Sequence, residues 1–215
     1  ELTALTSVFL IWAARSERTY RTGMRYLVIQ ITSGVLLLSG AILIVGETGS
    51  ITFSQIGIDS LGGKLILLSF GIKAAFPLLH NWLQDAYPEA TVTGTVFLSA
   101  FTTKLAIYAL ARGYPGTEML IWVGATMAVF PIFYAVIEND LRRVLAYCLN
   151  NQLGFMVVGV GIGTDLALNG AVSHAFAGIL YKGLLFMTMG AVLYRAGTAN
   201  GSDLGGLYKS MPWTT

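Results

Sequence analysis

The feature that most constrains the fold is a succession of long apolar segments. An α-helix needs about 20 predominantly apolar residues to cross the hydrocarbon layer of a membrane. Seven segments approach or exceed this length, at residues 1–14, 26–45, 65–83, 93–111, 119–137, 144–162 and 166–194. Backbone groups inside a bilayer must be hydrogen-bonded within their own segment, and no strand-like alternation accompanies these segments. The sequence therefore predicts an all-α polytopic transmembrane bundle of about seven helices, in a single domain over residues 1–215.

Composition and charge placement support a bilayer as the solvent. Hydrophobic residues make up 55% of the chain and charged residues only 11%, about half the charged share of a soluble domain. Cytoplasmic loops collect Lys and Arg, and with the first segment running inward eight basic residues fall on that side and two outside. The eight are Arg15, Arg18, Arg21, Arg25, Arg142, Arg143, Arg195 and Lys209, against Lys64 and Arg112. The pattern predicts a multi-pass integral membrane protein, which we expect in a bacterial inner membrane.

Three lysines fall inside the apolar segments, at Lys73, Lys104 and Lys182. A charged residue near the bilayer centre costs at least a few kcal/mol, so such residues face a bundle interior or a wet cavity and mark ion pathways. The alternative for Lys73 and Lys104 is that they lie near helix ends and extend their ammonium groups to the interface. The three lysines are candidates for an ion-translocation path.

A proline follows Lys73 by four residues. Pro77 has no N–H, so the carbonyl of Lys73 loses its intrahelical partner and segment 65–83 is expected to kink or break. Broken helices at mid-membrane are a device by which transporters handle ions, and a plain proline kink is the alternative. His80 is expected about two turns beyond Lys73 on the same face, where it could relay protons or simply pack.

The last apolar segment places His174, Gly178 and Lys182 at spacings of four, hence on one helical face. This spacing predicts a relay stripe, although glycines in the same segment also favour close helix packing. Asn151 and Gln152 interrupt another apolar segment. Their amides are expected either to bond across helices or to line a watered passage.

The common motifs of other chemistries are missing from the sequence. It has no phosphate-binding GxxxxGK[ST], no HExxH, no CxxC and no GxSxG motif. Its single cysteine, Cys148, lies among apolar residues and is expected to be a buried inert thiol. No cofactor, metal or nucleic-acid partner is therefore expected. The acidic residues Asp85, Glu89, Glu138, Asp140, Asp165 and Asp203 are expected in loops.

Three stretches resemble motifs of the antiporter-like subunits shared by respiratory complex I and Mrp-type cation/proton antiporters. Residues 73–86, KAAFPLLHNWLQDA, resemble K-x-P-x-x-P-L-H-x-W-L-P-D-A. Residues 140–154 resemble D-x-K-R-x-L-A-Y-S-x-x-S-Q-x-G, and residues 174–186 resemble H-x-x-x-H-x-x-F-K-x-x-L-F. Residues 137–143 are most similar to the D subunit of the Mrp-type antiporters. The departures are Ala75 and Gln84 for prolines, Cys148 for a serine and Gly178 for the second histidine.

The resemblance implies a role for each candidate residue. Glu1 would be the glutamate of the fifth transmembrane helix, paired with Lys73 of the broken seventh helix. Lys104 would be the central lysine, and His174 and Lys182 the pair on the eleventh helix. The chain would then be a fragment covering helices five to eleven, part of two inverted five-helix repeats.

These observations predict proton translocation by a chain that resembles part of the D subunit of a Na⁺/H⁺ antiporter. The alternatives are a proton-pumping subunit of complex I or of a membrane hydrogenase, and a purely structural membrane subunit. The chain is not expected to be an enzyme by itself. Its expected partners are other membrane subunits, H⁺, Na⁺ if it is an antiporter, and the lipid bilayer. An intramembrane hydrolase is disfavoured because no nucleophile motif occurs.

Overall fold

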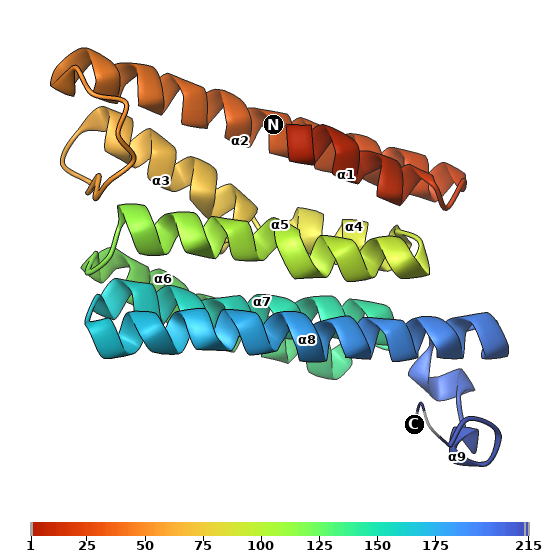
Figure 1. Cartoon of the computed structure of the whole chain (residues 1–215). Coiled ribbons are helices and arrows are strands. Elements are labelled where there is room, and N and C mark those ends of the chain that lie inside the picture. Colours follow the sequence, from red (N-terminus) through yellow and green to blue (C-terminus); the bar gives the residue numbers. More distant parts are fainter. Residues whose placement is uncertain (1, 213, 215) are drawn as a thin grey trace.

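The computed structural model describes residues 2–212 and 214, and this part of the chain is built from helices, as predicted (Figure 1). The helices are α1 (Leu2–Trp12), α2 (Glu17–Thr48), α3 (Leu61–Lys73), α4 (Asn81–Glu89), α5 (Val92–Gly113), α6 (Glu118–Ile137), α7 (Leu141–Ile162), α8 (Asp165–Ala196), the 3₁₀ turn η1 (Gly201–Asp203) and α9 (Leu207–Ser210). Glu1 lies outside the described residues.

Five of these helices are long and apolar enough to cross a membrane, namely α2, α5, α6, α7 and α8. They contain five of the seven predicted segments. The other two differ from the prediction: the described part of the first segment forms a helix of 11 residues, and segment 65–83 is divided between α3 and α4.

Local sequence signals explain where the long helices begin and end. The side chains of Ser16, Asp140 and Thr164 accept hydrogen bonds from the first turns of α2, α7 and α8. Each of these helices stops at a glycine with positive φ, at Gly49, Gly163 and Gly197.

The α2 helix starts at Glu17 rather than at residue 26. Arg18, Arg21 and Arg25 were expected in a loop but lie in the first turns of this helix. The assignment of three acidic residues to loops is also wrong, because Asp85 and Glu89 belong to α4 and Asp165 begins α8. Hydropathy locates the hydrocarbon boundary, whereas a polar helix can continue beyond that boundary into water.

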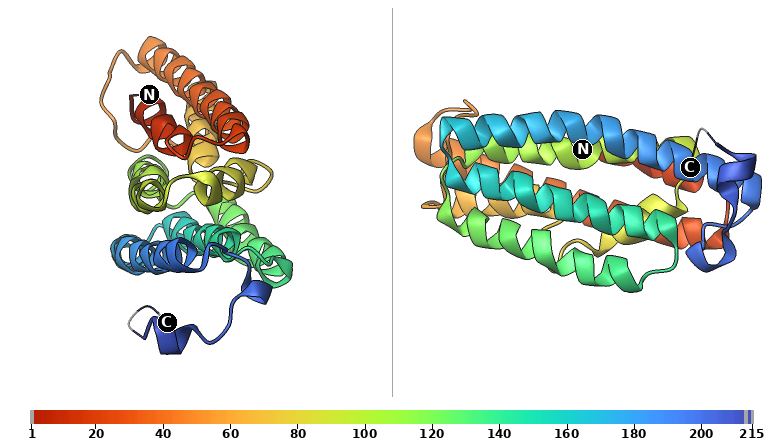
Figure 2. Two further views of the ribbon diagram at one scale, coloured as in Figure 1. Left: turned by 90° about the vertical axis from the view of Figure 1, so that its right-hand side faces the viewer. Right: turned by 90° about the horizontal axis from the view of Figure 1, so that it is seen from below.

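The helices run side by side as a slab (Figure 2). In the view along the helix axes, α1 and α2 form one edge, α4 and α5 lie in the middle, and α6, α7 and α8 form the other edge. Among the described elements, α2 packs against α1, α3 and α4, while α7 packs against α6, α8 and α4. The α5 helix contacts α3 on one side and α8 on the other, so it joins the two parts of the slab.

Small residues allow α6 and α7 to pack closely. A Cβ atom added to Gly154 of α7 would lie 2.7 Å from the carbonyl oxygen of Gly124 on α6, and one added to Gly124 would lie 2.8 Å from that of Gly154. Both distances are shorter than van der Waals contact, so the two backbones touch only because neither position has a side chain. For Gly170 of α8, no atom of the described residues lies within 4 Å of such a Cβ, so this position takes no part in the helix packing that the structure describes.

Candidate functional site

The predicted break in segment 65–83 is present between Lys73, the last residue of α3, and Asn81, the first of α4. The intervening chain turns sharply, with Ala75 at φ 60° and Leu78 at φ 70°. Trp82 closes the gap by donating its indole N–H to the carbonyl of Ile72, at 2.9 Å. The break therefore places the Lys73 side chain at the carboxyl end of a helix, the end that favours a positive charge.

His80 is not where the helical spacing predicted it. The expected shared face with Lys73 requires a continuous helix, whereas the backbone leaves helical geometry on both sides of Pro77. His80 is the residue immediately before α4. Its ring packs edge-on against the ring of Phe130 on α6, with 5.6 Å between the two ring centres. The prediction of a common face is wrong, and His80 packs against an aromatic residue instead.

Lys73 borders a cavity of about 400 Å³ between α1, α2 and α5. Besides Lys73, the polar residues of its wall are Thr3, Thr6, Ser7, Tyr26, Gln30 and Thr102. The hydroxyls of Ser7 and Tyr26 lie 2.7 Å apart. Gln30 is 1% exposed, and its Nε2 atom has no hydrogen-bond partner in the described part of the chain. A buried polar atom without a partner is a position at which water is expected.

Gln30 was not identified from the sequence. The signal was present, because an amide stands one helical turn after Tyr26 within an apolar segment. The proposed counter-charge for Lys73, Glu1, lies outside the described residues, so its position relative to Lys73 stays a prediction.

Lys104 lies in the middle of the bundle. Its side chain is 8% exposed, and its ammonium group donates a hydrogen bond to the carbonyl of Ser99 on the same helix, at 2.7 Å. It lies within electrostatic range of Lys182 and of His174, both on α8. The structure thus brings three of the predicted residues into one cluster where α5 and α8 pack together.

A hydrogen-bonded group connects this cluster to α7. His174 Nε2 lies 2.6 Å from Gln152 Oε1, and the Tyr181 hydroxyl donates to the same oxygen at 3.1 Å. The neighbouring amide of Asn151 donates to the carbonyl of Ala128 on α6. Of the two alternatives for these amides, bonding across helices is the one observed, and Gln152 is joined directly to the predicted histidine.

Lys182 is 5% exposed, and its Nζ atom lies 5.9 Å from the centre of the Tyr181 ring. It is also within electrostatic range of the Cys148 thiol on α7. Lys182 therefore points into the bundle rather than toward its surface, as its mid-segment position predicted.

A third buried cation is Arg142, which was not among the candidate site residues. It is 8% exposed, and its guanidinium donates to the carbonyls of Ala90 and Tyr87, at 2.8 and 3.4 Å, and to the Thr95 hydroxyl, at 2.7 Å. Arg142 lies at the start of α7, so it connects this helix to the carboxyl end of α4 and the first turn of α5. Hydropathy had assigned Arg142 to a loop, and only its place in the 140–154 motif marked it as special.

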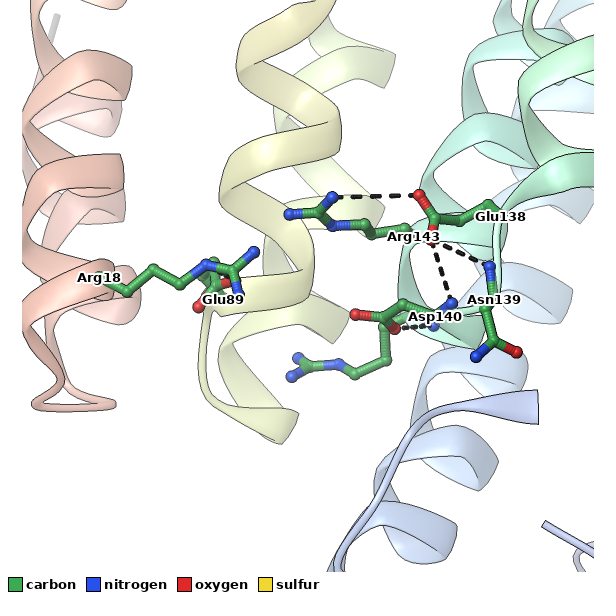
Figure 3. Close-up of polar contacts among 7 residues, drawn as sticks. Arg18, Glu89, Glu138, Asn139, Asp140 and Arg143 are labelled. Carbon is green, nitrogen blue, oxygen red and sulfur yellow. Dashed lines mark hydrogen bonds and ion pairs between the residues drawn. The ribbon is translucent and has the colours of Figure 1, made fainter. Parts of the chain in front are cut away.

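Ion pairs surround this end of α4 (Figure 3). Arg18 of α2 pairs with Glu89 of α4 at 2.8 Å. On the other side, Glu138 accepts hydrogen bonds from the backbone N–H groups of Asn139 and Asp140 and lies 3.9 Å from Arg143. Helices α2 and α7 thus each hold the carboxyl end of α4 by an arginine. Among the described residues, no group of three or more His, Cys, Asp or Glu side chains could hold a metal ion.

Comparison with known proteins gives one consistent group of relatives. A family described as NADH:quinone oxidoreductase/Mrp antiporter, TM, matches residues 1–215. The whole chain is 32% identical to part of the N subunit of NADH-quinone oxidoreductase from Desulforudis audaxviator, covering 47% of that protein. Over 99% of its length it is 29% identical to the D subunit of the Na(+)/H(+) antiporter from Alkalihalophilus pseudofirmus, again covering 47% of the relative.

Among solved structures, a chain of the Mrp complex from Dietzia sp. superposes with a TM-score of 0.86 at 27% identity. The superposition covers 93% of this chain and 40% of that one. The chain thus spans less than half the length of the relatives that it matches.

Proposed function

The chain belongs to the NADH:quinone oxidoreductase/Mrp antiporter transmembrane family, and on this premise we propose that it forms part of a subunit that moves protons across a membrane. The observation that carries the proposal is the burial of Lys104 and Lys182 in apolar helices, at 8% and 5% exposure. Charged side chains are costly in such positions and are retained where they bind or relay ions.

In the proposed path, Lys73 receives a proton from the polar cavity at its side and Glu1 tunes this step. Lys104 is the central carrier, and His174 and Lys182 pass the proton onward. Support comes from the position of Lys104, which lies within electrostatic range of both His174 and Lys182. Two ammonium groups repel strongly in a medium of low dielectric constant, so protonation of one favours release from the other. Gln152, bonded to His174 and Tyr181, fixes the orientation of the imidazole.

The relatives suggest two possible energy sources for this transport. The similarity to the D subunit of a Na(+)/H(+) antiporter supports exchange of H⁺ for Na⁺. The similarity to the N subunit of an NADH-quinone oxidoreductase supports a pump driven by electron transfer elsewhere in a complex. In both cases the subunit carries out no reaction by itself and functions with other membrane subunits. We favour the antiporter, in a bacterial inner membrane.

The test is proton transport by the full-length protein, assembled with its partner subunits and reconstituted into liposomes with a pH-sensitive dye. Lys73→Ala and Lys104→Met are expected to abolish transport while assembly is retained. Lys64→Ala is the matched control, because Lys64 is an exposed lysine on the same helix as Lys73. Intact transport by Lys73→Ala would contradict the mechanism and support a structural role for these charges.

The same liposomes separate the two energy sources. Addition of Na⁺ to one side is expected to drive a proton flux in the opposite direction. If Na⁺ has no effect and flux requires an electron donor and acceptor, the redox-driven alternative replaces the antiporter.

A further inference from the structure

A groove runs along the outside of the bundle between α2 and α4. It consists of two adjoining cavities of about 660 and 260 Å³, which share Ile29, Asn81 and Trp82 in their walls. The larger cavity begins at Tyr20 and Arg21, and the smaller one ends at Leu78 and Leu79 in the break before α4. Between these ends the wall is mainly apolar, with Met24, Val28, Ile29, Ile72 and Trp82.

The groove has a cationic end. Arg21 and Arg25 lie in its wall, one helical turn apart on α2. Arg25 is exposed and makes no hydrogen bond or ion pair in the part of the chain that the structure describes, while Arg21 pairs with Glu17 at the surface. Both arginines also line an adjacent polar cavity of about 550 Å³, whose wall carries four arginines and three carboxylates. The wall of the groove itself carries two arginines and one carboxylate, Asp85 of α4. Arg25, which has no partner in the described chain, is the group that can bind an anion here.

The length of the groove matches one leaflet of a bilayer. Its α2 wall extends from Tyr20 to Thr32, which at 1.5 Å per residue is about 18 Å. Half of a hydrocarbon core of about 30 Å is nearly the same distance. The exposed Tyr20 beside the arginines is the kind of residue found at the level of lipid headgroups.

We propose that this groove binds an anionic phospholipid of the leaflet on the arginine side. Its phosphate lies against Arg25 and Arg21, and one acyl chain follows Met24, Ile29 and Trp82 toward Leu79. A guanidinium binds phosphate oxygens through charge-assisted, often bidentate hydrogen bonds. The apolar wall of the groove packs against the acyl chain. A phospholipid is the occupant that supplies both an anion at one end and an apolar chain of one leaflet's length.

This site is separate from the buried cations of the proposed proton path. None of its wall residues belongs to the cluster of Lys104, His174 and Lys182. It does, however, touch the break, through Leu78 and Leu79, so an acyl chain in the groove packs against the link between α3 and α4.

The experiment is lipid binding to the purified full-length protein in its complex, stripped of lipid and then offered phosphatidylglycerol or phosphatidylcholine in detergent. Native mass spectrometry is expected to show retention of phosphatidylglycerol at least fivefold greater than that of phosphatidylcholine. The double variant Arg21→Gln/Arg25→Gln is expected to lose this preference. Arg15→Gln is the control, because Arg15 is exposed in the turn before α2 and lines neither cavity.

A second pair of variants tests the apolar wall. Ile29→Trp fills the groove and is expected to reduce phosphatidylglycerol retention several-fold. Val35→Trp, on an exposed position of α2 outside both cavities, is expected to leave it unchanged. Equal binding of the two lipids, full retention by the double arginine variant, or a protein segment occupying the groove in the assembled complex would each overturn the proposal.

Discussion

Gln30 combines two properties that are rarely found together at one residue. It is fully buried, yet its Nε2 atom has no partner among the described residues, and it borders the cavity beside Lys73. An unsatisfied buried polar group lowers stability by about 1–3 kcal/mol. A sequence selected only for stability would place an apolar residue here. The amide is therefore expected to have a function in the cavity, which is to order water next to Lys73.

Gln30→Leu is therefore expected to increase stability by about 1 kcal/mol, because it removes a buried amide whose Nε2 atom has no partner among the described residues. The same change is expected to reduce proton transport several-fold, because it removes a polar group that orders water next to Lys73. The two measurements are the thermal midpoint of the reconstituted protein and the liposome flux. If Gln30→Leu leaves the proton flux unchanged, the cavity does not supply protons to Lys73.

Among the helices, α4 is the element most dependent on its neighbours. It has only 9 residues, contains Pro88, and begins at the break. A helix this short is not stable by itself in water. Its position depends on Trp82 at one end and on Arg142 and Arg18 at the other.

Arg142→Met is expected to destabilise the protein by about 2–3 kcal/mol, because it leaves the carbonyls of Tyr87 and Ala90 without their charged donor in a buried site. Arg143→Gln is the control. The Arg143 side chain is 31% exposed and its nearest carboxylate oxygen is 3.9 Å away, so a loss of about 0.5 kcal/mol or less is expected. Thermal unfolding in detergent measures both. Equal effects of the two substitutions would contradict a special role for Arg142.

The break itself contains backbone strain. Leu78 is 90% exposed and has φ 70°, a conformation that costs a side-chain-bearing residue about 1–2 kcal/mol. Leu78→Gly is expected to stabilise the protein by about 0.5–1 kcal/mol, because it removes this strain without removing a packed side chain. Leu68→Gly, at an exposed position within α3, is expected to have the opposite sign, with a loss of about 1 kcal/mol. Denaturant or thermal unfolding of the pair distinguishes strain at Leu78 from a general effect of glycine.

Apolar length and Pro77 were sufficient to predict the five long helices and the break. They were not sufficient for the start of α2, because a polar helix outside the hydrocarbon layer leaves no mark in hydropathy. His80 was misplaced for a different reason: helical spacing has no meaning across a segment that leaves helical geometry. Arg142 was missed because its donors are satisfied by backbone carbonyls of another helix, which no sequence pattern displays. The roles of Lys73, Lys104, His174 and Lys182 stay predictions.

At the scale of the whole molecule, the described chain is a row of helices in which α6, at one edge, packs mainly against a single neighbour. The α6 helix depends mainly on α7, across the backbone contact at Gly124 and Gly154. Gly154→Leu is expected to destabilise the protein by about 3 kcal/mol, because the new side chain would have to force the two helices apart. Gly170→Leu on α8 is the control and is expected to be nearly neutral or stabilising, because this position has open space around it and leucine favours helix. Thermal unfolding of the two variants is the measurement, and similar midpoints would show that α6 is held in another way.

The cavity beside Lys73 also has an electrical consequence. Membrane voltage falls across insulating material, and water in the cavity of about 400 Å³ beside Lys73 would shorten the insulating distance at this point of the bundle. A charge crossing 100 mV gains about 2.3 kcal/mol. If part of the membrane thickness conducts, the voltage drops across the remaining insulating part, which lies between the cavity and the opposite membrane surface. Proton movement from Lys73 toward Lys104 would then experience a steeper field than the membrane thickness suggests.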